Sequence, residues 1–282
     1  MTGTPIVSLL TDYGRDDEFV GVCHGVILGI APEARIIDLT HEIPRHDVRR
    51  GAIVLRNSLP YVRAGVHMAV VDPQVGGDRR ALAVGCSDGT LLVGPDNGLL
   101  SLAWDRCGGV DLAVDISLSR HRLEPVSSTF HGRDLFAPVA AALASGAELV
   151  EAGEQVDSEQ LERIALPHPI FEPDGSVIAH VVTVDAYGNV TLDITHDQLA
   201  GTGLMLGVTA EIVVDSGEGG AAVQLGGGRL AAPFVRTFAD VGPHEAIVYE
   251  DASRALAIAI NRGDAAAELG LRPDDEVRLR PR

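Results

Sequence analysis

The sequence predicts an α/β fold, in which a mostly parallel sheet flanked by helices is followed by a second, mainly β domain. In the first half of the chain, short apolar runs alternate with stretches of helical periodicity, the pattern of a parallel sheet covered by helices. In the second half, short β runs are separated by glycine-rich turns, as in small barrels and sandwiches. The 282 residues are enough for two such domains.

The first elements follow one another as strand, helix, strand, helix and strand. Residues 6–10, 35–39 and 66–71 are short apolar runs that predict strands. Asp47 is expected to cap the second helix, because a short polar side chain there can accept from a free backbone N–H. The first helix is predicted from six apolar residues at helical spacing, namely Phe19, Val22, Cys23, Val26, Ile27 and Ile30.

A hairpin and a long helix complete the predicted N-terminal domain. Residues 81–86 and 90–93 flank the Ser-Asp-Gly turn at 87–89, a composition typical of a β-hairpin. Residues 135–149 are rich in alanine and leucine and predict a packed helix.

A cluster of chain breakers then marks a boundary. Pro167, Pro169 and Pro173 lie just before an Asp-Gly turn, so we expect an N-terminal α/β domain at residues 1–166 and a C-terminal β domain at residues 167–282. In the second domain we expect strands at 177–184, 207–214, 221–225 and 246–249, and glycine-rich turns at 217–220 and 226–228.

Charge and cysteine content exclude several kinds of partner. With 22 basic and 40 acidic residues the formal net charge is −18, which repels nucleic acid and anionic membrane surfaces. The three cysteines form no C-x-x-C pair, so neither a disulfide framework nor a zinc knuckle is expected. The sequence shows no basic leader and no apolar segment long enough to span a bilayer. We therefore expect a soluble, cytoplasmic protein.

Common catalytic motifs do not occur in the sequence. There is no G-x-G-x-x-G after a strand and no lysine-containing phosphate loop, so a classical Rossmann or P-loop enzyme is not expected. His41 and His46 do not have the H-E-x-x-H spacing and have no third ligand at a useful spacing, so no metal site is predicted. Ser127 and Ser128 lack the G-x-S-x-G elbow of a serine nucleophile.

Polar residues at strand ends are the main candidates for a site. Asp12 follows the first strand and Asp72 the third, and ligands of open α/β sheets bind at the carboxyl ends of strands. We expect both carboxylates in one crevice, although aspartate after a strand also forms ordinary turns. Two glycine-containing segments are further candidates: the loop 72–80 with its arginine pair, and residues 129–134 with His131 at a helix start. Solvated arginines and a structural histidine are the alternatives there.

Six ordered motifs together resemble those of one family. They are L-T-D-Y-G at 10–14, V-D-P at 71–73 with Arg79, G-P-D-N-G-L-L at 94–100, S-T-F-H-G-R-D at 128–134, Asp185 with Y-G-N at 187–189, and Ser253 and Arg254 with Asn261. In these motifs the chain resembles the S-adenosyl-L-methionine (SAM) hydroxide adenosyltransferases, relatives of fluorinase and chlorinase, over nearly its whole length.

The resemblance implies a fold, an assembly, an activity and site residues. It implies an N-terminal α/β domain, a C-terminal β-barrel-like domain, and a homotrimer with active sites between the N-domain of one subunit and the C-domain of the next. The activity is hydrolysis of SAM to adenosine and L-methionine, with no metal or redox cofactor. Asp72, Arg79 and His131 are the implied catalytic residues, which position and activate water. The implied substrate-binding residues are Asp12 for the ribose hydroxyls, Asp17 and Asp185 for the methionine amino end, Asn189 for adenine, Ser253 and Arg254 for both ends, and Phe130.

Two departures from the family pattern keep alternatives open. Gln74 replaces a glycine of the first loop, and residues 192–194 read L-D-I in place of T-N-I. The alternatives are a halogenase that makes 5′-chloro-5′-deoxyadenosine, and an idle adenosyl-binding module in which Gln74 fills the water site. Water is favoured, because the Asp72 carboxylate repels a halide in a low-dielectric cavity and the His131 base is useful only where there is a proton to take. Gly132 is the feature that leaves room for chloride.

Overall fold

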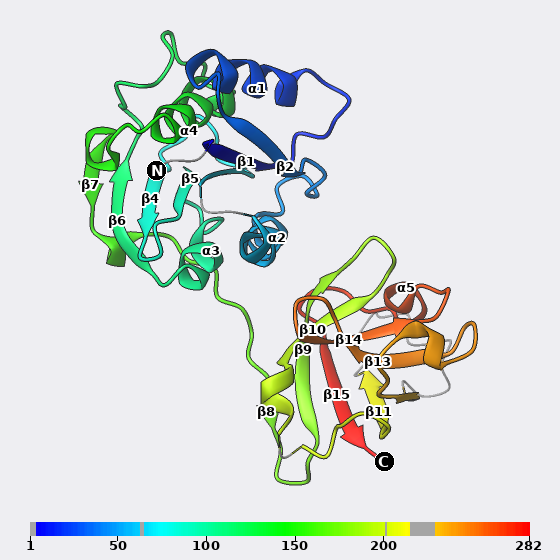
Figure 1. Cartoon of the computed structure of the whole chain (residues 1–282). Helices are drawn as coiled ribbons and strands as arrows, with labels where there is room; N and C mark the ends of the chain where they lie inside the picture. Colours follow the sequence, from blue (N-terminus) through cyan, green and yellow to red (C-terminus); the bar gives the residue numbers. More distant parts are fainter. Residues whose placement is uncertain (1–3, 63–64, 201, 215–228) are drawn as a thin grey trace. The chain divides into compact units, whose positions relative to one another are not determined.

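The chain forms two compact units in a computed structural model, Met1–Ile164 and Ala165–Arg282 (Figure 1). The first unit ends just before the predicted proline-rich boundary. The structure describes residues 4–62, 65–200, 202–214 and 229–282. The strand expected at 221–225 and the turns expected at 217–220 and 226–228 lie outside the described residues.

The N-terminal unit is a seven-stranded sheet in the order β2-β1-β3-β5-β4-β6-β7. The first four strands of this order pair in parallel, while β4, β6 and β7 pair antiparallel. The strands are β1 Ile6–Thr11, β2 Arg35–Thr40, β3 Val66–Val70, β4 Ala81–Cys86, β5 Leu91–Pro95, β6 Val110–Asp115 and β7 Glu154–Val156. The helices are α1 Phe19–Ile30, α2 Val48–Ser58, α3 Ser101–Arg106 and α4 Ala137–Ala144. The predicted α/β class is confirmed.

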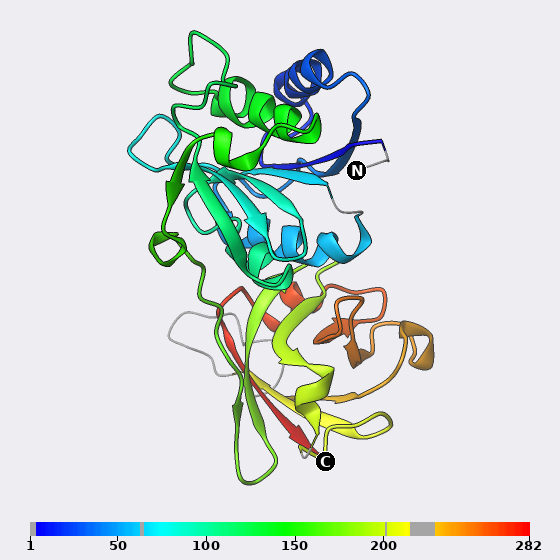
Figure 2. The same ribbon diagram turned by 60° about the vertical axis from the view of Figure 1, so that its left-hand side comes forward.

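Helices cover both faces of this sheet, α1 and α4 on one and α2 and α3 on the other (Figures 1 and 2). Side chains of β1 alternate between the two layers: Val7 and Leu9 pack with α1 and α4, and Leu10 packs with α2 and α3. Cys23 and Ile27, one turn apart on α1, are fully buried in the first layer. Burial on both faces explains why β1, β3 and β4 read as nearly continuous apolar runs.

The ends of two predicted helices show how local sequence acts. The Asp47 side chain caps α2 as predicted, accepting a hydrogen bond from the backbone N–H of Arg50 at 2.8 Å. The helix predicted at 135–149 differs at both ends. A π-helical turn, Gly132–Phe136, leads into α4, and the helix ends near Gly146, whose φ of +96° is left-handed.

In its described residues, the C-terminal unit is an eight-stranded antiparallel sheet, with a main path β12-β11-β15-β9-β10-β14-β13 and β8 paired to β9. A bridge between Phe234 and Val248 brings the two ends of this path together, so the sheet is nearly closed. This confirms the barrel-like β fold. The elements are β8 Ile170–Phe171, β9 Val177–Val184, β10 Val190–Thr195, β11 Thr209–Val214, β12 Arg229–Pro233, β13 Ala246–Glu250, β14 Ala255–Ile260, α5 Ala265–Leu269 and β15 Glu276–Pro281.

Candidate functional site

Two neighbouring strand ends place carboxylates at the same edge of the N-terminal sheet. β1 and β3 pair in parallel up to Thr11 and Val70, so the residues that follow them emerge together. Asp12 and Asp72 lie there, and the charges of both carboxylates act on the phenol of Tyr13. The edge corresponds to the carboxyl ends of parallel strands, where α/β proteins bind ligands.

Asp72, Arg79 and His131 form one hydrogen-bonded group, called the trio below. The Nε atom of Arg79 lies 3.0 Å from each carboxylate oxygen of Asp72, and Nη2 makes a further contact with Oδ2. The same Nη2 donates to Nδ1 of His131 over 2.8 Å. The side chains of Arg79 and Asp72 are only 3% and 5% exposed. The guanidinium is therefore fixed by its carboxylate and directed at the imidazole.

The direction of the hydrogen bond sets the protonation state of His131. Arginine offers N–H donors and no acceptor, so Nδ1 of His131 must accept and carries no proton. The neutral ring then carries its proton on Nε2. Burial and the charge of Arg79 lower the pKa of His131 below its usual 6.5, against an opposing contribution from Asp72. Near neutral pH His131 is thus a neutral donor through Nε2–H.

A glycine in the loop after β3 lets Arg79 approach His131. Gly76 has a φ of +77°, and a Cβ at this position would lie 2.2 Å from the carbonyl oxygen of Ser128. The loop therefore packs backbone to backbone against the segment that carries His131. Gln74, in the same loop, is exposed.

Three aromatic rings pack beside the trio. Tyr13 and Phe130 lie edge to face with centroids 5.8 Å apart, and Phe19 lies 5.1 Å from Phe130. A Cβ at Gly132 would lie 2.2 Å from the Tyr13 hydroxyl. The Tyr13 side chain therefore occupies the space directly beside Gly132, and the expectation that Gly132 leaves room for a larger anion stays a prediction.

Tyr13 belongs to a sequence motif but was assigned no role from the sequence. Its burial raises the pKa of its hydroxyl well above the usual 10, and the carboxylates of Asp12 and Asp72 raise it further, while Arg79 opposes them. The phenol therefore stays neutral beside these charges. Only the packing of residue 13 against residue 132 shows that its size matters.

Asp12 and Asp17 lie in the loop between β1 and α1. The Oδ2 atom of the half-buried Asp12 accepts from the backbone N–H of His46 at 2.9 Å, and Asp17 is exposed. The loop is tied to the segment after β2 by a 2.8 Å hydrogen bond from the Gly14 N–H to the His41 carbonyl. This loop thus has a defined path at the edge of the sheet.

In the C-terminal unit, Asp185 organises the turn between β9 and β10. Its Oδ1 accepts from the backbone N–H groups of Tyr187 and Asn189 at 2.8 and 2.9 Å, and its Oδ2 accepts from Nδ2 of Asn189 at 2.8 Å. Both carboxylate oxygens are therefore engaged within the turn. Asn189 is held with its amide nitrogen toward Asp185.

A second turn, between β13 and β14, carries Ser253 and Arg254. Both are exposed, and Arg254 has a left-handed φ of +64°. Oδ1 of Asp251 accepts from the Ser253 N–H at 2.8 Å, a contact that the sequence analysis missed because Asp251 matches no motif. Burial raises the pKa of Tyr249 to about 12, and the charges of Asp185 and Asp251 add to the shift. The pKa of the Tyr249 phenol is thus raised by carboxylates of both turns.

The L-D-I segment at 192–194 is part of the framework of this unit. Leu192 and Ile194 are buried in its core. Asp193 accepts from both the backbone N–H and Nδ1 of His180, at 2.8 and 2.7 Å. This departure from the family pattern therefore puts a packed leucine in place of the threonine, and an aspartate that is hydrogen-bonded to His180 in place of the asparagine.

Sequence profiles of two domains match most of the chain. The profile described as the SAM hydroxide adenosyltransferase N-terminal domain matches residues 7–153, and that of the C-terminal domain matches residues 179–278. Among the described residues, no helix is both long and apolar enough to cross a bilayer.

Several proteins resemble the chain along almost its full length. A protein of Salinispora tropica, named (R)-S-adenosyl-L-methionine hydrolase, is 46% identical over 280 residues, which is 99% of both chains. A Thermus thermophilus protein of the same name is 35% identical and covers 97% of this chain and 98% of its own. A fluorinase of Actinopolyspora mzabensis is 24% identical over 98% of this chain and 97% of its own.

The fold is also found in solved structures. The crystal structure of a conserved protein from Thermotoga maritima aligns with a TM-score of 0.87 at 33% identity, covering 97% of this chain and 99% of that one. The crystal structure of a conserved protein from Thermus thermophilus aligns with a TM-score of 0.73, also at 33% identity, over 98% and 99% of the two chains.

Proposed function

The chain belongs to the SAM hydroxide adenosyltransferase family, and on that premise we propose that it hydrolyses SAM to adenosine and L-methionine. Relatives at 46% identity are named hydrolases of (R)-SAM, while the fluorinases are more distant, at 24% identity. The observation that carries the proposal is the trio, which holds a guanidinium and an imidazole N–H donor together in a buried setting. These are the groups needed to stabilise a small oxygen nucleophile.

The nucleophile is hydroxide stabilised by the trio. Free water has a pKa of about 15.7, so a site must favour hydroxide or remove a proton during attack. Nδ1 of His131 is engaged by Arg79 and is not available as a base. The Arg79 charge and the Nε2–H of His131 instead stabilise hydroxide, and the proton of the water passes to solvent.

Displacement at the ribose completes the reaction. The hydroxide oxygen forms a bond to C5′, the C5′–S bond breaks, and its electron pair returns to sulfur. Methionine leaves as a neutral thioether, so no general acid is needed, and no electrons are transferred to or from a redox cofactor.

Size, and not charge, separates hydroxide from halide at the trio, because both nucleophiles are monoanions. The Asp72 carboxylate is neutralised by Arg79, so its repulsion of an anion is smaller than the sequence alone suggests. Tyr13 occupies the space beside Gly132, and we infer that this leaves less room for a chloride than for hydroxide. The exposed position of Gln74 argues against the idle module, in which that side chain would fill the water site.

In the N-terminal unit we assign Asp12, Asp17 and Phe130 to the substrate. Oδ2 of Asp12 accepts a hydrogen bond from the backbone N–H of His46. This contact orients the carboxylate, and Oδ1 accepts from the ribose hydroxyls. Asp17 supplies negative charge for the methionine ammonium, and the Phe130 ring forms an apolar wall next to the trio.

In the C-terminal unit, the two turns supply the remaining contacts. Because Nδ2 of Asn189 donates to Asp185, its Oδ1 is left to accept from the adenine amino group. Asp185 adds negative charge near the ammonium. Ser253 and Arg254 reach the adenine and the methionine carboxylate from their exposed turn.

The assembly we propose is a homotrimer in the cytoplasm, with each active site shared between subunits. The assigned residues fall in both units, and α1 and β2 expose the apolar side chains of Phe19, Leu28, Ile30 and Ile37, which a subunit contact would cover. The three cysteines are free and buried, as in a reducing compartment. Light scattering should give three times the chain mass of 29.6 kDa.

One experiment separates the three candidate functions. Purified protein is incubated with (R)-SAM in ¹⁸O-labelled water at high chloride, and the products are separated and identified by mass spectrometry. We expect methionine and adenosine labelled in its 5′-hydroxyl. The yield of labelled adenosine should be greatly reduced in Arg79→Met and normal in Arg120→Met, a control that removes an exposed arginine. Mainly 5′-chloro-5′-deoxyadenosine would show a halogenase, and bound but unchanged SAM would show the idle module.

A further inference from the structure

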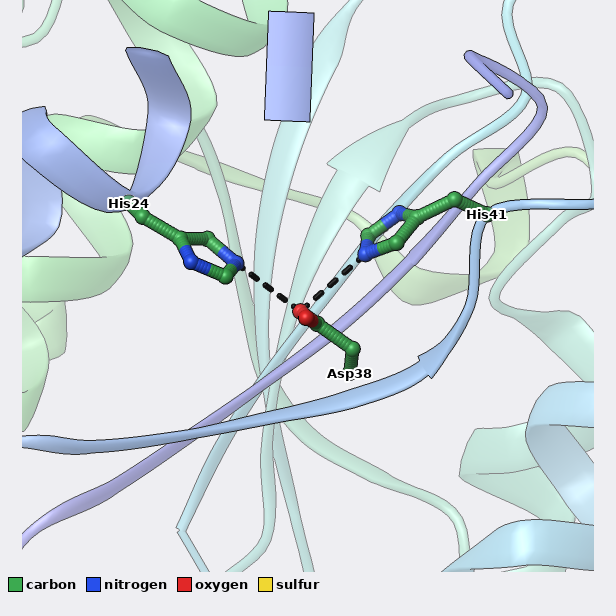
Figure 3. Close-up of side chains that lie close together, drawn as sticks. All are labelled: His24, Asp38 and His41. Atoms are coloured by element: carbon green, nitrogen blue, oxygen red, sulfur yellow. Dashed lines mark hydrogen bonds and ion pairs between the residues drawn. The ribbon is translucent and has the colours of Figure 1, made fainter. Parts of the chain in front are cut away.

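A second cluster of titratable side chains lies outside the proposed active site. His24 of α1, Asp38 of β2 and His41, the first residue after β2, converge on one point (Figure 3). The Nε2 atoms of His24 and His41 lie 2.9 and 3.0 Å from the same oxygen, Oδ1 of Asp38. All three potential ligand atoms lie within 4.8 Å of one another. No step of the proposed hydrolysis uses this cluster.

We propose that His24, Asp38 and His41 form a binding site for a divalent transition metal, with Zn²⁺ as the best fit. Two imidazoles and one carboxylate are the ligands of many three-residue zinc sites, in which water occupies the fourth position. A water ligand could reach an ion here, because the side chains of His24 and Asp38 are 29% and 34% exposed. The side chain of His41 is only 2% exposed. Solvent therefore reaches one side of the cluster only.

The buried member supplies an independent indication of a ligand. Nε2 of His41 has no hydrogen-bond partner among the described residues, although Oδ1 of Asp38 lies 3.0 Å away. The ring nitrogen thus lies close to the oxygen, but the two atoms are not aligned as in a hydrogen bond. A lone pair with this direction and a carboxylate oxygen at this distance can both point at a shared cation. A buried nitrogen that has neither a hydrogen-bond partner nor a bound cation destabilises the folded state.

The other nitrogen of His41 has the contact that metal-bound histidines usually make. Nδ1 lies 2.9 Å from Oγ1 of the buried Thr11, which fixes the ring orientation. When Nδ1–H donates to this hydroxyl, Nε2 is left as a lone-pair donor toward Asp38. Two acceptors would then face each other, and a cation between them removes the repulsion.

The two distances from Asp38 to the imidazoles are close to those of a tetrahedral ion. Zinc bonds to nitrogen and oxygen are about 2.0–2.2 Å long, so two tetrahedral ligand atoms are about 3.3 Å apart. The 2.9 and 3.0 Å separations within the cluster need only a small outward movement to reach this value. An ion there would join α1 to β2 and to the segment after it.

The competing explanation is a metal-free network in which both imidazoles donate to Asp38. His24 makes such a hydrogen bond at 2.9 Å. In that case the protein binds zinc no better than scattered surface histidines do, and the loss of one imidazole changes zinc affinity little.

The test is metal titration of the full chain, purified without a histidine tag and treated with chelator. Calorimetry with Zn²⁺ should give one ion per chain, and Co²⁺ should produce the visible absorption of a tetrahedral site. His24→Ala should weaken Zn²⁺ binding at least about 100-fold and abolish the Co²⁺ spectrum, because a direct ligand is removed. His121→Ala, the same change outside the cluster, should stay within about 2-fold of the wild type.

Two outcomes would overturn the proposal. One is the absence of stoichiometric Zn²⁺ binding by the wild type. The other is a Zn²⁺ affinity of His24→Ala equal to that of His121→Ala. His24 is chosen because it is partly exposed, and circular dichroism of both variants verifies that they are folded.

Discussion

Two clusters of the N-terminal unit combine an aspartate with at least one imidazole, but only one of them also contains an arginine. In the trio, Asp72 is saturated by the guanidinium of Arg79, and His131 meets that guanidinium and not the carboxylate. In the cluster of His24, Asp38 and His41, one carboxylate oxygen faces two imidazole nitrogens. An internal fixed cation makes the first group suited to an anion, hydroxide. The second group has no such internal cation among these three residues, which suits it to binding one.

His67 shows the behaviour of a buried imidazole that is hydrogen-bonded neither to a carboxylate nor to a guanidinium. Its Nδ1 pairs with the hydroxyl of Ser8 at 2.7 Å, and the ring is 1% exposed. Burial lowers the pKa of His67 to about 4, with a small opposing effect of Asp88. Desolvation by itself therefore keeps an imidazole neutral, and the neighbouring charges decide what it does beyond that.

The largest effect is expected when the cation of the trio is removed. Arg79→Met leaves the buried Asp72 unpaired, so the free energy of unfolding should fall by about 3–5 kcal/mol. Hydrolysis should fall by at least about 10²–10³-fold, because the charge that stabilises hydroxide is lost. Urea unfolding and adenosine formation measure the two effects.

The control for this variant is Arg120→Met. Arg120 pairs with Glu151 at the surface, where the side chains are 59% and 52% exposed. Its loss should cost less than about 1 kcal/mol and leave hydrolysis unchanged. Equal effects of the two substitutions would mean that the trio has no special role.

The role of the imidazole is tested by two substitutions at position 131. His131→Ala should lower kcat by about 10²-fold or more. His131→Gln can still accept from Arg79 and donate an N–H, so it should stay within about 10-fold of the wild type. If Gln is as inactive as Ala, His131 acts as a general base and not as a donor.

The pH profile sharpens the same point. Burial and Arg79 lower the pKa of His131, so the acid limb of kcat/KM should lie below pH 6.5. Below that limb the protonated ring can no longer accept from Arg79. The limb should disappear in His131→Gln, and an acid limb above pH 6.5 in the wild type would contradict the assignment.

The uncharged reference, His67, predicts a change of stability with pH. Its pKa of about 4 in the folded state lies below its usual 6.5, so the unfolded chain binds the proton first as the pH falls. The stabilisation is complete above pH 6.5 and is lost toward pH 4, by roughly 3 kcal/mol. Urea unfolding of wild type and His67→Gln at several pH values should show a flatter profile in the variant. Parallel profiles would exclude His67 as the cause.

The smallest effect is expected from the contact that limits space beside the trio. Gly132→Ala pushes a methyl group into the Tyr13 hydroxyl and should destabilise the fold by about 1–3 kcal/mol. Tyr13→Phe removes that hydroxyl, so the double variant should recover part of the loss. Additive effects in this double-mutant cycle would mean that the two residues do not limit each other.

The sequence by itself determined the order of the elements and the residues that follow the strands. Helical spacing located α1, and the short polar side chain of Asp47 located the start of α2, because both signals act within a few residues. The same local patterns placed Asp12 and Asp72 after strands, and the ordered motifs identified the family. The end of α4 was missed because the helical composition continues past Gly146, where the backbone turns left-handed.

Only the tertiary structure decided which of these residues meet and in which direction their hydrogen bonds run. Arg79 reaches His131 because Gly76 packs on the backbone of Ser128, far away in sequence. His41 finds its neighbours on α1 and β2, not at the nearby His46, because the parallel pairing of β1 and β2 folds the chain back beside the helix. Spacing along the chain cannot report such contacts, since they depend on the packing of elements that are separate in sequence.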